Sequence, residues 1–378
     1  MRCETFRFDE VTINFDRKRI PLSAKQRSER QGNYRYYGAQ GVIDYVDDYI
    51  FDGTYLLIAE DGENLKSQKQ NIAQIAKGKF WVNNHAHIVQ TNEHCDLQYL
   101  YYLINSMDLS GYITGSAQPK LSQANLNAVT LQLPSIEEQK KIVAILGALD
   151  DKIELNNKIN ENLERQAEAI FKAWFIAFEP WNGKKPCEWV DAPLGSFVEI
   201  KRGGSPRPIQ DFLSDTGLRW LKISDVTSLT SPYILDIKEH IKLEGLRKTV
   251  HLNAGELVLS NSATPGIPKI LDVDSCIHDG WLYFPKSQLS KYWLYLFFKH
   301  IRQELILLGN GSIFTNLKTD ILKAFPVTKA DEKTLYAFEK LIKPLFETML
   351  NADRESKRLT ALRDALLPKL MSGEIQIL

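Results

Sequence analysis

Two long segments of the chain repeat one spacing of apolar residues, and this repeat constrains the fold more than any other feature. In the first segment, apolar residues recur in alternating steps of four and three, the spacing of a helix that packs along a partner helix. Ser135 and Glu138 have the S-x-x-E arrangement of a capping box, and Pro180 lies beyond the last position. The spacing predicts one helix of about 40 residues, or roughly 60 Å. Its seam positions are Ile142, Leu146, Leu149, Ile153, Leu163, Ala167, Ile170 and Trp174, with Asn156 and Asn160 in the middle.

A second segment near the C-terminus has the same spacing, position for position. Its residues are Phe338, Ile342, Leu345, Met349, Ala352, Ser356, Leu359, Arg363, Leu366 and Leu370. Pro344 lies inside this segment, so we expect the helix to bend near its start. Two equal helices in one chain pack most simply as an antiparallel coiled coil. If they align end to end, Asn156 faces Ser356 and Asn160 faces Ala352.

The stretches that precede the two helices also correspond loosely. TYLLIAEDG, Thr54 to Gly62, matches GELVLSNSA, Gly255 to Ala263, and an aromatic amphipathic segment follows in both, LQYLYYLINS and SKYWLYLFFKH. Short alternating strands, Gly-Pro-Asn turns and one or two late helices are typical of the α+β class. We therefore predict an α+β fold with a pseudo-two-fold internal repeat, in which two long antiparallel coiled-coil helices separate two globular domains. The predicted boundaries are 1–133 for the first domain, 134–179 for the first helix, 180–190 for a linker, 191–326 for the second domain and 327–378 for the second helix.

Composition narrows the class of protein. The 378 residues exceed the usual size of one core, and 44% hydrophobic with 25% charged residues is ordinary for a globular protein. No apolar run reaches the roughly 18 residues of a membrane span, and the start MRCETFRFDE lacks a signal-peptide core. We therefore expect a cytoplasmic protein without membrane contact. Cys3, Cys95, Cys187 and Cys276 lie far apart with no C-x-x-C pair, which argues against a disulfide framework and a zinc ribbon.

Three segments of the sequence resemble one protein family. LPSIEEQKKIVAILGALDDKIELNNKINENLERQAEAIFKAWF, Leu133 to Phe175, resembles the central conserved region of the DNA-specificity subunits of type I restriction-modification enzymes. RLTALRDALLPKLMSGEI, Arg358 to Ile375, resembles their second conserved region. YRYYGAQGVIDYVDDYIFDGTYLLIAEDG, Tyr34 to Gly62, resembles the first target-recognition domain of many such subunits. The resemblance covers essentially the whole chain, although the E-E-Q of the first helix has no counterpart in VTKADEKTLYAFEKLIKP, at the start of the second.

This resemblance implies a non-catalytic adaptor. In that family each globular domain reads one half of a bipartite target in double-stranded DNA, while the helices separate the halves and bind two methyltransferase subunits. Restriction and translocase subunits join for cleavage. The resemblance implies no cofactor in this chain, with S-adenosylmethionine, ATP and Mg expected in the partner subunits alone. The sequence agrees in lacking a G-x-x-x-x-G-K-[ST] loop and an N-P-P-[FY] or D-P-P-[FY] tetrapeptide.

Residues for DNA contact are predicted in both domains. Net charge is zero, but only the face that meets phosphate must be basic, and Asp16 to Arg35 carries seven basic residues against two acidic ones. Arginine can bond a guanine edge through two N–H groups, and glycine lets the backbone approach closely. The first-domain candidates are Lys18, Arg19, Lys25, Arg27, Arg30 and Arg35, with Tyr36, Tyr37 and Gly38 expected in a turn. Around the Gly-Gly turn of IKRGGSPRP the candidates are Lys201, Arg202, Gly203, Gly204, Ser205 and Arg207, followed by Trp220, Lys222, Asn261 and Thr264.

Each of these assignments has a plainer alternative. The basic segment can be a solvated loop, Tyr36 and Tyr37 can be core residues, and about half of the basic side chains are expected to contact solvent alone. We therefore predict DNA contact for these loops rather than for any single residue within them. The main competing function is that of a coiled-coil scaffold protein without sequence-specific DNA binding.

Three further patterns suggest chemistry and are weaker. Glu199 and Lys201 after Asp191 could form a nuclease-like site, a spacing that arises easily by chance. His85 and His87 alternate as if on one strand face near His94 and Cys95, which suggests zinc, but a neutral structural histidine is the more common explanation. The acidic residues Asp44, Asp47, Asp48 and Asp52 alternate with aromatic ones and fit strand and turn positions better than a cation site. We predict no metal.

Asn156 and Asn160 leave one question open. Buried asparagines in a helix seam can fix the register of the two helices. Leu155 and Ile159 lie off the strict spacing, however, and could move the apolar stripe sideways so that Asn156 lies at its flank. The sequence alone does not decide between the two arrangements.

Overall fold

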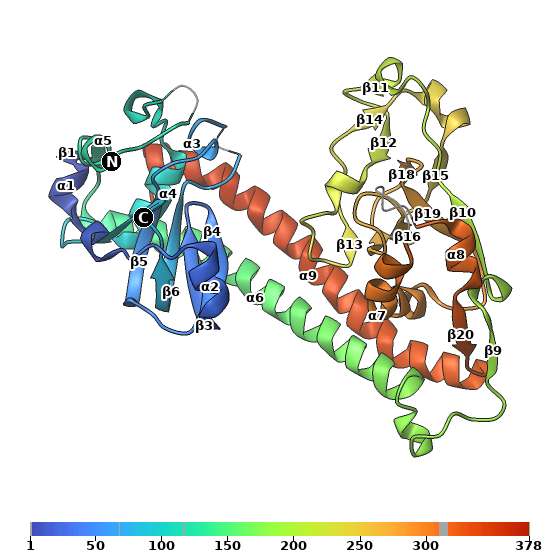
Figure 1. Ribbon diagram of the computed structural model, residues 1–378. Coiled ribbons are helices and arrows are strands. Elements are labelled where there is room, and N and C mark those ends of the chain that lie inside the picture. The colour runs from blue at the N-terminus through green and yellow to red at the C-terminus, as the bar shows by residue number, and fades with distance from the viewer. Residues whose placement is uncertain (1, 68, 116–117, 310–316, 378) are drawn as a thin grey trace. The chain divides into compact units, whose positions relative to one another are not determined.

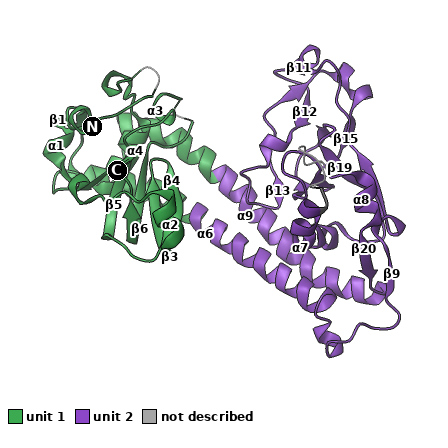
Figure 2. Cartoon of the chain, in the orientation of Figure 1, with its two compact units in different colours: residues 1–152, 359–378 green, residues 153–358 purple. Residues whose placement is uncertain are grey.

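The computed structural model describes residues 2–67, 69–115, 118–309 and 317–377, which divide into two compact units (Figure 2). Unit 1 comprises residues 1–152 and 359–378, and unit 2 comprises residues 153–358. Two long helices, α6 (Ile136–Phe175) and α9 (Glu332–Ser372), are labelled in Figure 1, and each contributes residues to both units. The two helices predicted from the apolar spacing are therefore present, and α9 is continuous through Pro344. The units divide within these helices rather than at their ends.

Unit 1 is built on a mixed sheet. Among the described residues this sheet has six strands in the order β2-β7-β5-β6-β3-β4, in which β3 and β6 are parallel and the other neighbours antiparallel. The strands are β2 (Thr12–Asn14), β3 (Gln31–Gly38), β4 (Gly41–Val46), β5 (Phe51–Ala59), β6 (Ala73–Val82) and β7 (Ala86–Thr91). A separate pair, β1 (Glu4–Arg7) with β8 (Thr130–Leu133), leads into α6. The shorter helices are α1 (Phe8–Val11), α2 (Ala24–Glu29), α3 (Asn64–Ser67), α4 (Leu97–Ser106), α5 (Gln123–Asn127), η1 (Asp16–Lys18) and η2 (Ser110–Tyr112).

Unit 2 has two small mixed sheets. In the described residues each has five strands, ordered β10-β19-β16-β17-β13 and β11-β14-β12-β18-β15. The strands are β10 (Val198–Arg202), β11 (Leu213–Ser214), β12 (Leu218–Leu221), β13 (Tyr233–Ile234), β14 (His240–Ile241), β15 (Val250–Leu252), β16 (Leu257–Ser260), β17 (Pro268–Leu271), β18 (Ser275–Ile277) and β19 (Trp281–Ser287). A separate pair, β9 (Val190–Pro193) with β20 (Pro326–Lys329), leads into α9. The helices are α7 (Lys291–Gly309), α8 (Thr319–Ala324), η3 (Glu179–Trp181), η4 (Leu194–Ser196), η5 (Ile209–Asp211), η6 (Ile223–Asp225) and η7 (Leu243–Lys248).

The internal repeat is visible in the order of the elements. In each unit an aromatic helix, α4 or α7, follows the late strand of a sheet, and a short helix, α5 or α8, precedes the strand that leads into a long helix. The starts of the long helices differ in detail. At α6, the Ser135 amide donates to Glu138 (3.2 Å) and the Glu138 amide donates to the Ser135 hydroxyl (3.4 Å), which is the predicted capping box. At α9, the Asp331 carboxylate accepts from the Thr334 amide (3.0 Å) instead.

The predicted seam is present in the structure, but the buried face of the two helices is wider than predicted. Of the apolar seam positions, seven are buried with at most 3% of their surface exposed, namely Ile142, Leu146, Ala167, Phe338, Ile342, Met349 and Leu370. Apart from Asn156 and Asn160, the remaining predicted positions are partly buried, namely Leu149, Ile153, Leu163, Ile170, Trp174, Leu345, Ala352, Ser356, Leu359, Arg363 and Leu366. Phe171 and Phe346, which the strict spacing omits, are fully buried because the helices also pack against α7 and its sheet in unit 2. The apolar face is therefore wider than a coiled-coil seam.

The asparagines lie inside the seam in unit 2. Asn156 is 2% exposed and Asn160 9%, whereas Leu155 is 50% exposed, so the stripe does not move sideways. The Asn156 amide donates to the Ser356 hydroxyl (3.2 Å), to Glu355 (2.8 Å) and to the Ala352 carbonyl (3.4 Å). The predicted facing of Asn156 and Ser356 is confirmed.

Asn160 bonds to residues on either side of Ala352, its predicted neighbour on α9. The Asn160 amide donates to the Met349 carbonyl (3.3 Å) and to the Asp353 carboxylate (2.7 Å). The Ala352 carbonyl accepts from Asn156, one helical turn earlier on α6. A step forward along α6 thus corresponds to a step backward along α9, as in an antiparallel pair.

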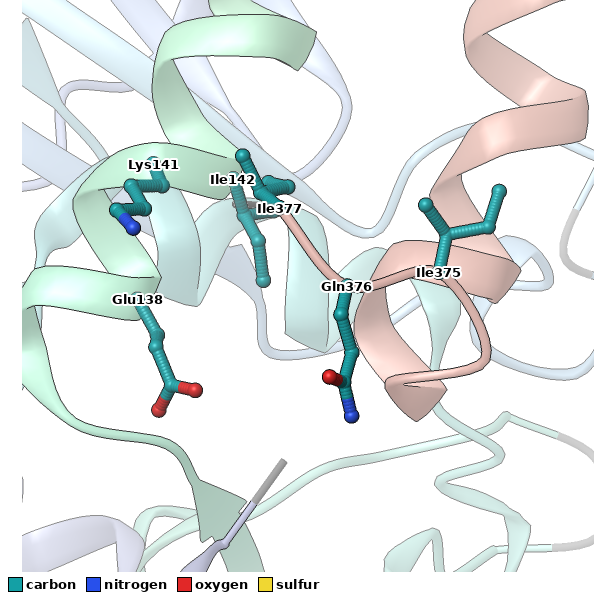
Figure 3. Close-up of a pocket in the computed structure, with 6 residues that line it drawn as sticks. All are labelled: Glu138, Lys141, Ile142, Ile375, Gln376 and Ile377. Atoms are coloured by element: carbon teal, nitrogen blue, oxygen red, sulfur yellow. The ribbon is translucent and has the colours of Figure 1, made fainter.

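The C-terminal segment returns to the start of α6 in unit 1. Ile377 packs with the unit 1 core and lies beside Ile142 (Figure 3). A hollow of about 110 Å³ remains there, lined by Glu138, Lys141, Ile142, Ile375, Gln376 and Ile377. In the described part of the chain, no helix is long and apolar enough to cross a membrane.

Phe346→Ala should destabilise unit 2. The side chain is 0% exposed and its ring lies 4.6 Å from that of Tyr292 and 5.3 Å from that of Tyr295. Removing a buried phenyl ring costs about 3 to 5 kcal/mol, so we expect a lower urea midpoint in the unfolding of the isolated chain. The control, Leu341→Ala, removes a side chain of the same helix that is 49% exposed, and should change the free energy of unfolding by less than about 0.5 kcal/mol. Equal effects of the two substitutions would contradict the packing described above.

Candidate nucleic-acid interface

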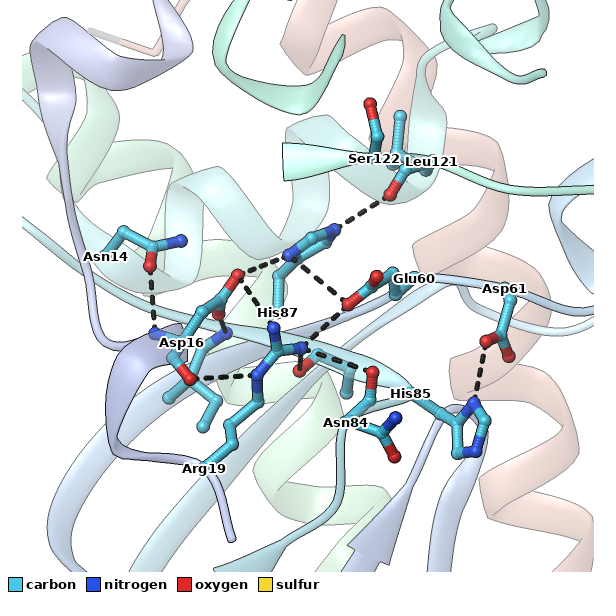
Figure 4. A network of polar contacts seen from close by, with 12 residues as sticks. Asn14, Asp16, Arg19, Glu60, Asp61, Asn84, His85, His87, Leu121 and Ser122 are labelled. Carbon is cyan, nitrogen blue, oxygen red and sulfur yellow. Dashed lines mark hydrogen bonds and ion pairs between the residues drawn. The ribbon is translucent and has the colours of Figure 1, made fainter. Parts of the chain in front are cut away.

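Arg19 of the predicted basic segment is held within a buried polar network of unit 1 (Figure 4). Its guanidinium donates to Glu60 (2.7 Å) and to the Ala86 carbonyl (2.9 Å). The ring of His87 lies between the Asp16 carboxylate, 2.6 Å from Nδ1, and the Leu121 carbonyl, 2.8 Å from Nε2. The network ties η1 and the segment before α5 to strand β7, so Arg19 has a structural position rather than an exposed one.

Asp16 is the centre of this network. Burial alone would raise the pKa of its carboxyl group, but hydrogen bonds from the His87 ring and the Ile88 amide, with the nearby charge of Arg19, hold the pKa below its usual value. The Ile88 amide donates at 2.8 Å. Asp16 is therefore an anion that fixes the loop from which the basic segment begins.

Arg27 and Arg30 are held by carboxylates of the neighbouring strand and loop. Arg27 donates to Asp44 (2.9 Å), and Arg30 pairs with Asp47 at 2.9 Å. Each guanidinium also lies over an aromatic ring, Arg27 over Tyr36 at 5.1 Å and Arg30 over Trp81 at 5.0 Å. The aspartates that suggested a cation site thus orient arginines instead.

Tyr36, Tyr37 and Gly38 do not lie in a turn, as the sequence predicted. They belong to strand β3, which pairs with both β4 and β6 and is therefore interior to the sheet. Tyr36 is 0% exposed and its hydroxyl accepts a hydrogen bond from the Leu22 amide at 2.8 Å. Tyr37 is 5% exposed. A core position explains both rings.

The remaining candidates of the first domain are exposed. Lys18 lies at the end of η1 over the Phe15 ring at 5.2 Å, and Lys25 lies on α2 with an ion-pair distance of 4.0 Å to Glu29. Arg35 is exposed on β3, and contact with the Tyr37 hydroxyl raises the pKa of its guanidinium. We group these three cations with the partly exposed Arg27 and Arg30 under the name unit 1 basic face.

In unit 2, one acidic residue forms hydrogen bonds to several residues of the predicted basic turn. Asp279 accepts from the Ser205 hydroxyl (2.8 Å) and from Arg207 (3.0 Å), and its carbonyl accepts from Arg202. Burial would raise the pKa of Asp279, but Ser205 and Arg207 hold it below the usual value. Gly203 is required beside it, since a Cβ there would lie 2.3 Å from the His278 carbonyl oxygen. The turn of Gly203 to Arg207, with Asp279, is termed the unit 2 turn.

The other unit 2 candidates are divided between this turn and the core. The Asn261 amide donates to the Gly280 carbonyl at 2.8 Å, which places the residue next to the unit 2 turn, although it is 3% exposed. Thr264 lies in the same loop and is partly buried. Trp220 is 3% exposed and is a core residue of β12. Lys222 is partly exposed and pairs with Glu239.

Two acidic residues that organise the basic segments, Asp279 and Asp16, were not among the site residues predicted from the sequence. Asp279 precedes Gly280, and an Asp-Gly pair marks a turn, which was the available signal. Asp16 was counted as an opposing charge within the basic segment. Its partner His87 is distant in the sequence, so nothing local indicated the contact.

The patterns that suggested enzyme chemistry do not converge. Lys201 pairs with Glu199 at 3.0 Å on β10, while Asp191 bonds to Thr328 at 2.7 Å on another strand pair. His85 precedes β7 rather than lying on it, and it contacts Asp61 at 2.6 Å. Within the described residues, no group of three or more His, Cys, Asp or Glu side chains could hold a metal ion.

Comparison with protein families gives two matches within the chain. Residues 2–165 and residues 186–334 both match the type I restriction modification DNA specificity domain. The specificity subunit of the type I restriction enzyme MjaIX of Methanocaldococcus jannaschii is 27% identical over 304 residues, which cover 74% of this chain and 69% of that protein. The HindI specificity subunit of Haemophilus influenzae is 25% identical, over 89% of this chain and 87% of that protein.

A solved structure has the same fold. The S subunit of a type I restriction-modification system from M. genitalium superposes with a TM-score of 0.63, and the match covers 98% of this chain and 96% of that one. The two sequences are 14% identical, so the likeness concerns the fold alone.

The Asp16 network should make the stability of unit 1 depend on pH. A carboxyl group whose pKa is lowered in the folded state stabilises the fold above its unfolded pKa, and this stabilisation is lost as pH falls through the folded value. We expect Asp16→Asn to cost about 3 to 5 kcal/mol near pH 7, with a smaller difference from the wild type below about pH 4. Urea denaturation across this pH range measures the difference.

The control for this experiment is Asp9→Asn. Asp9 pairs with Arg7 at 2.9 Å on the surface of the same unit, so its loss should cost less than about 1 kcal/mol. A difference between Asp16→Asn and the wild type that stays constant down to pH 3 would contradict the ionic role of Asp16.

Proposed function

Because this chain belongs to the type I restriction-modification DNA specificity family, we propose that each of its two units reads one half of a bipartite DNA target for a methyltransferase and endonuclease complex. The observation that carries this proposal is the double match, in which two successive segments of one chain each match the specificity domain and each is followed by a long helix. One domain per half-site is the simplest use of such a repeat.

The unit 1 basic face and the unit 2 turn are the proposed contact surfaces. Phosphate contacts position a protein on DNA, and contacts to base edges specify the sequence. Lys18, Lys25 and Arg35 are exposed cations suited to the first task. Arg27 and Arg207 are each held by a carboxylate and keep further N–H groups for bases. These surfaces do not include Arg19, Tyr36 and Trp220. Arg19 is hydrogen-bonded within unit 1, and the two aromatic side chains are buried.

The helices are proposed to set the spacing between the half-sites. Asn156 and Asn160 donate to α9 from within the seam. Displacing α9 by one turn would separate these amides from their acceptors, and each buried polar group left without a partner costs about 1 to 3 kcal/mol. The asparagines therefore favour one register, and hence one distance along the helices.

The outer faces of the helices support the docking of two methyltransferase subunits. In unit 1, α6 exposes Ile145 and α9 exposes Leu362, which are 36% and 48% exposed. In unit 2, α6 exposes Leu155 and α9 exposes Leu341, at 50% and 49%. Both units thus expose apolar side chains from both helices, which suits one partner per unit.

The chain is proposed to be non-catalytic. The paired residues Glu199 and Lys201 have no third acidic group beside them in the contacts described above. Methyl transfer, cleavage and translocation would then come from partner subunits, which would bind S-adenosylmethionine, Mg and ATP. The cytoplasm, where the host DNA lies, is the compartment that this role requires.

Methylation mapping tests the proposed function. In cells that express this chain with its methyltransferase subunits, we expect methylation at a motif of two short specified parts with a fixed unspecified gap. The control is a culture that lacks this chain. Methylation without sequence preference, or unchanged methylation when this chain is absent, would favour the scaffold alternative and sink the proposal. Purified chain alone should show no methyltransferase, nuclease or ATPase activity.

Replacing Asn156 and Asn160 together by leucine tests the role of the helices in spacing. The substitution removes the amide donors and leaves the carboxylates of Glu355 and Asp353 without these bonds. We expect an altered gap in the methylated motif, or loss of assembly. Asn157→Leu is the control, because Asn157 is exposed on the same helix and should leave the gap unchanged. A more stable double variant with the original gap would refute the register role.

A further inference from the structure

A groove in unit 2 is lined by strand β10, which leads into the unit 2 turn, and is not used by the contacts proposed above. It has a volume of about 550 Å³ and is formed by η4, β10, β19 and the end of α8. Its walls carry three lysines, Lys201 from β10, Lys286 from β19 and Lys323 from α8, against one carboxylate, Glu199. We call it the lysine groove.

The charges in the lysine groove are open to a ligand. All three lysines are exposed. Lys201 pairs with Glu199 at 3.0 Å, and Lys286 lies opposite Glu199 in the antiparallel register of β10 and β19. Lys323 is 3.8 Å from Asp320, a carboxylate that is itself 96% exposed and therefore neutralises it weakly. The groove as a whole has an excess of positive charge over Glu199.

Protection of the sheet edge does not account for these lysines. β10 is an edge strand, and lysine on an edge strand commonly prevents pairing with another chain. Lys286, however, belongs to the interior neighbour β19, and Lys323 to a helix. Three elements thus place ammonium groups around one concavity, where Ser196 of η4 adds an exposed hydroxyl.

Strand β10 connects the groove to the unit 2 turn. Lys201 immediately precedes Arg202, which the Asp279 carbonyl fixes at the start of that turn. Basic residues thus lie at both ends of this segment, Arg202 and Arg207 at the turn and Lys201, Lys286 and Lys323 at the groove. Ammonium groups act as point charges that suit phosphate oxygens, whereas base readout favours the arginine fork.

We propose that the lysine groove binds backbone phosphates of duplex DNA next to the half-site that unit 2 reads. This inference rests on the proposed function and extends it from sequence readout to positioning. It assigns Lys286 and Lys323 as positioning residues that strengthen binding to every sequence equally. Glu199 opposes the ligand and limits the strength of this non-specific contact.

Salt titration of binding to a random-sequence duplex tests the inference. Each phosphate contact contributes about 0.9 to the slope of log K against log salt concentration. The full chain with Lys286→Gln and Lys323→Gln should lose roughly 2 from this slope, with the methylated motif unchanged. Lys333→Gln with Lys340→Gln is the charge-matched control, since both residues are exposed on α9 outside the groove, and its slope should equal that of the wild type.

Glu199→Gln provides a variant with the opposite sign. Removing the carboxylate from the groove should tighten binding to the random duplex and leave the fold intact, because Glu199 is partly exposed on β10. Tighter binding together with the lost slope of the lysine variant supports the groove. An unchanged slope in the lysine variant overturns it, even if that variant loses affinity for tripolyphosphate, since a free polyphosphate would then be the ligand.

The outcomes separate this inference from the proposed function. If the lysine variant keeps the wild-type slope while the wild type still methylates a two-part motif, the groove inference fails and the proposed function stands. If the wild type methylates no such motif, the proposed function fails whatever the slope.

Discussion

The hydrogen bonds from Asn156 and Asn160 to α9 are the interaction on which the arrangement of the two long helices depends. A seam of apolar side chains alone tolerates a shift by one helical turn, because the shifted seam again buries apolar surface. A buried amide has no such freedom, since its partners lie at fixed positions on the other helix. Here the partners include two carboxylates, at 2.8 Å and 2.7 Å, which makes these bonds stronger than those to neutral groups. On the proposal made above, these polar residues in the seam would limit the helices to one register.

Polar contacts also connect helix α9 to the second recognition domain. Asp353, which accepts from Asn160, also accepts from the Ser231 hydroxyl in the loop before β13. Burial raises the pKa of Asp353 even though Ser231 and Asn160 donate to it. Lys269 lies close by, where burial lowers its pKa to about 8 and its ammonium group donates to the Leu229 carbonyl at 2.7 Å.

Further contacts on the same turn of α9 fix the domain to the helix. Arg354 bonds to both oxygens of Asp272, at 2.9 Å and 2.6 Å, and Lys357 donates to the Leu235 carbonyl at 3.0 Å. Unit 1 has its own junction, in which Asp150 of α6 accepts from Tyr102 of α4 at 2.6 Å and from Arg363 of α9 at 2.8 Å. The orientation of each domain on its helices is therefore set by polar contacts, which have a defined direction.

Features that depend on local periodicity could be predicted from the sequence, and features that depend on distant pairs could not. The steps of four and three gave both long helices, and the pairing of Ser135 with Glu138 gave the start of the first. The same reasoning placed Asn160 opposite Ala352, because spacing fixes a position on a helix but not how far a side chain reaches. Arg19 looked like a DNA contact because its partner Glu60 lies 41 residues away in the chain. The sequence of a basic segment does not show which acidic residues contact it in the folded chain.

Those acids also explain how a chain with zero net charge can have a DNA-binding surface. Asp44, Asp47 and Asp279 each hold an arginine that would otherwise move freely, and an arginine with one bonded edge keeps other N–H groups for a ligand. Such a pair contributes orientation rather than net charge. Contacts to bases need orientation, whereas attraction to phosphate needs charge, so the two tasks fall to different residues. The oriented arginines are suited to bases, and the weakly paired lysines are suited to the DNA backbone. This division of tasks follows from how each side chain is paired. It does not require an excess of basic residues in the chain.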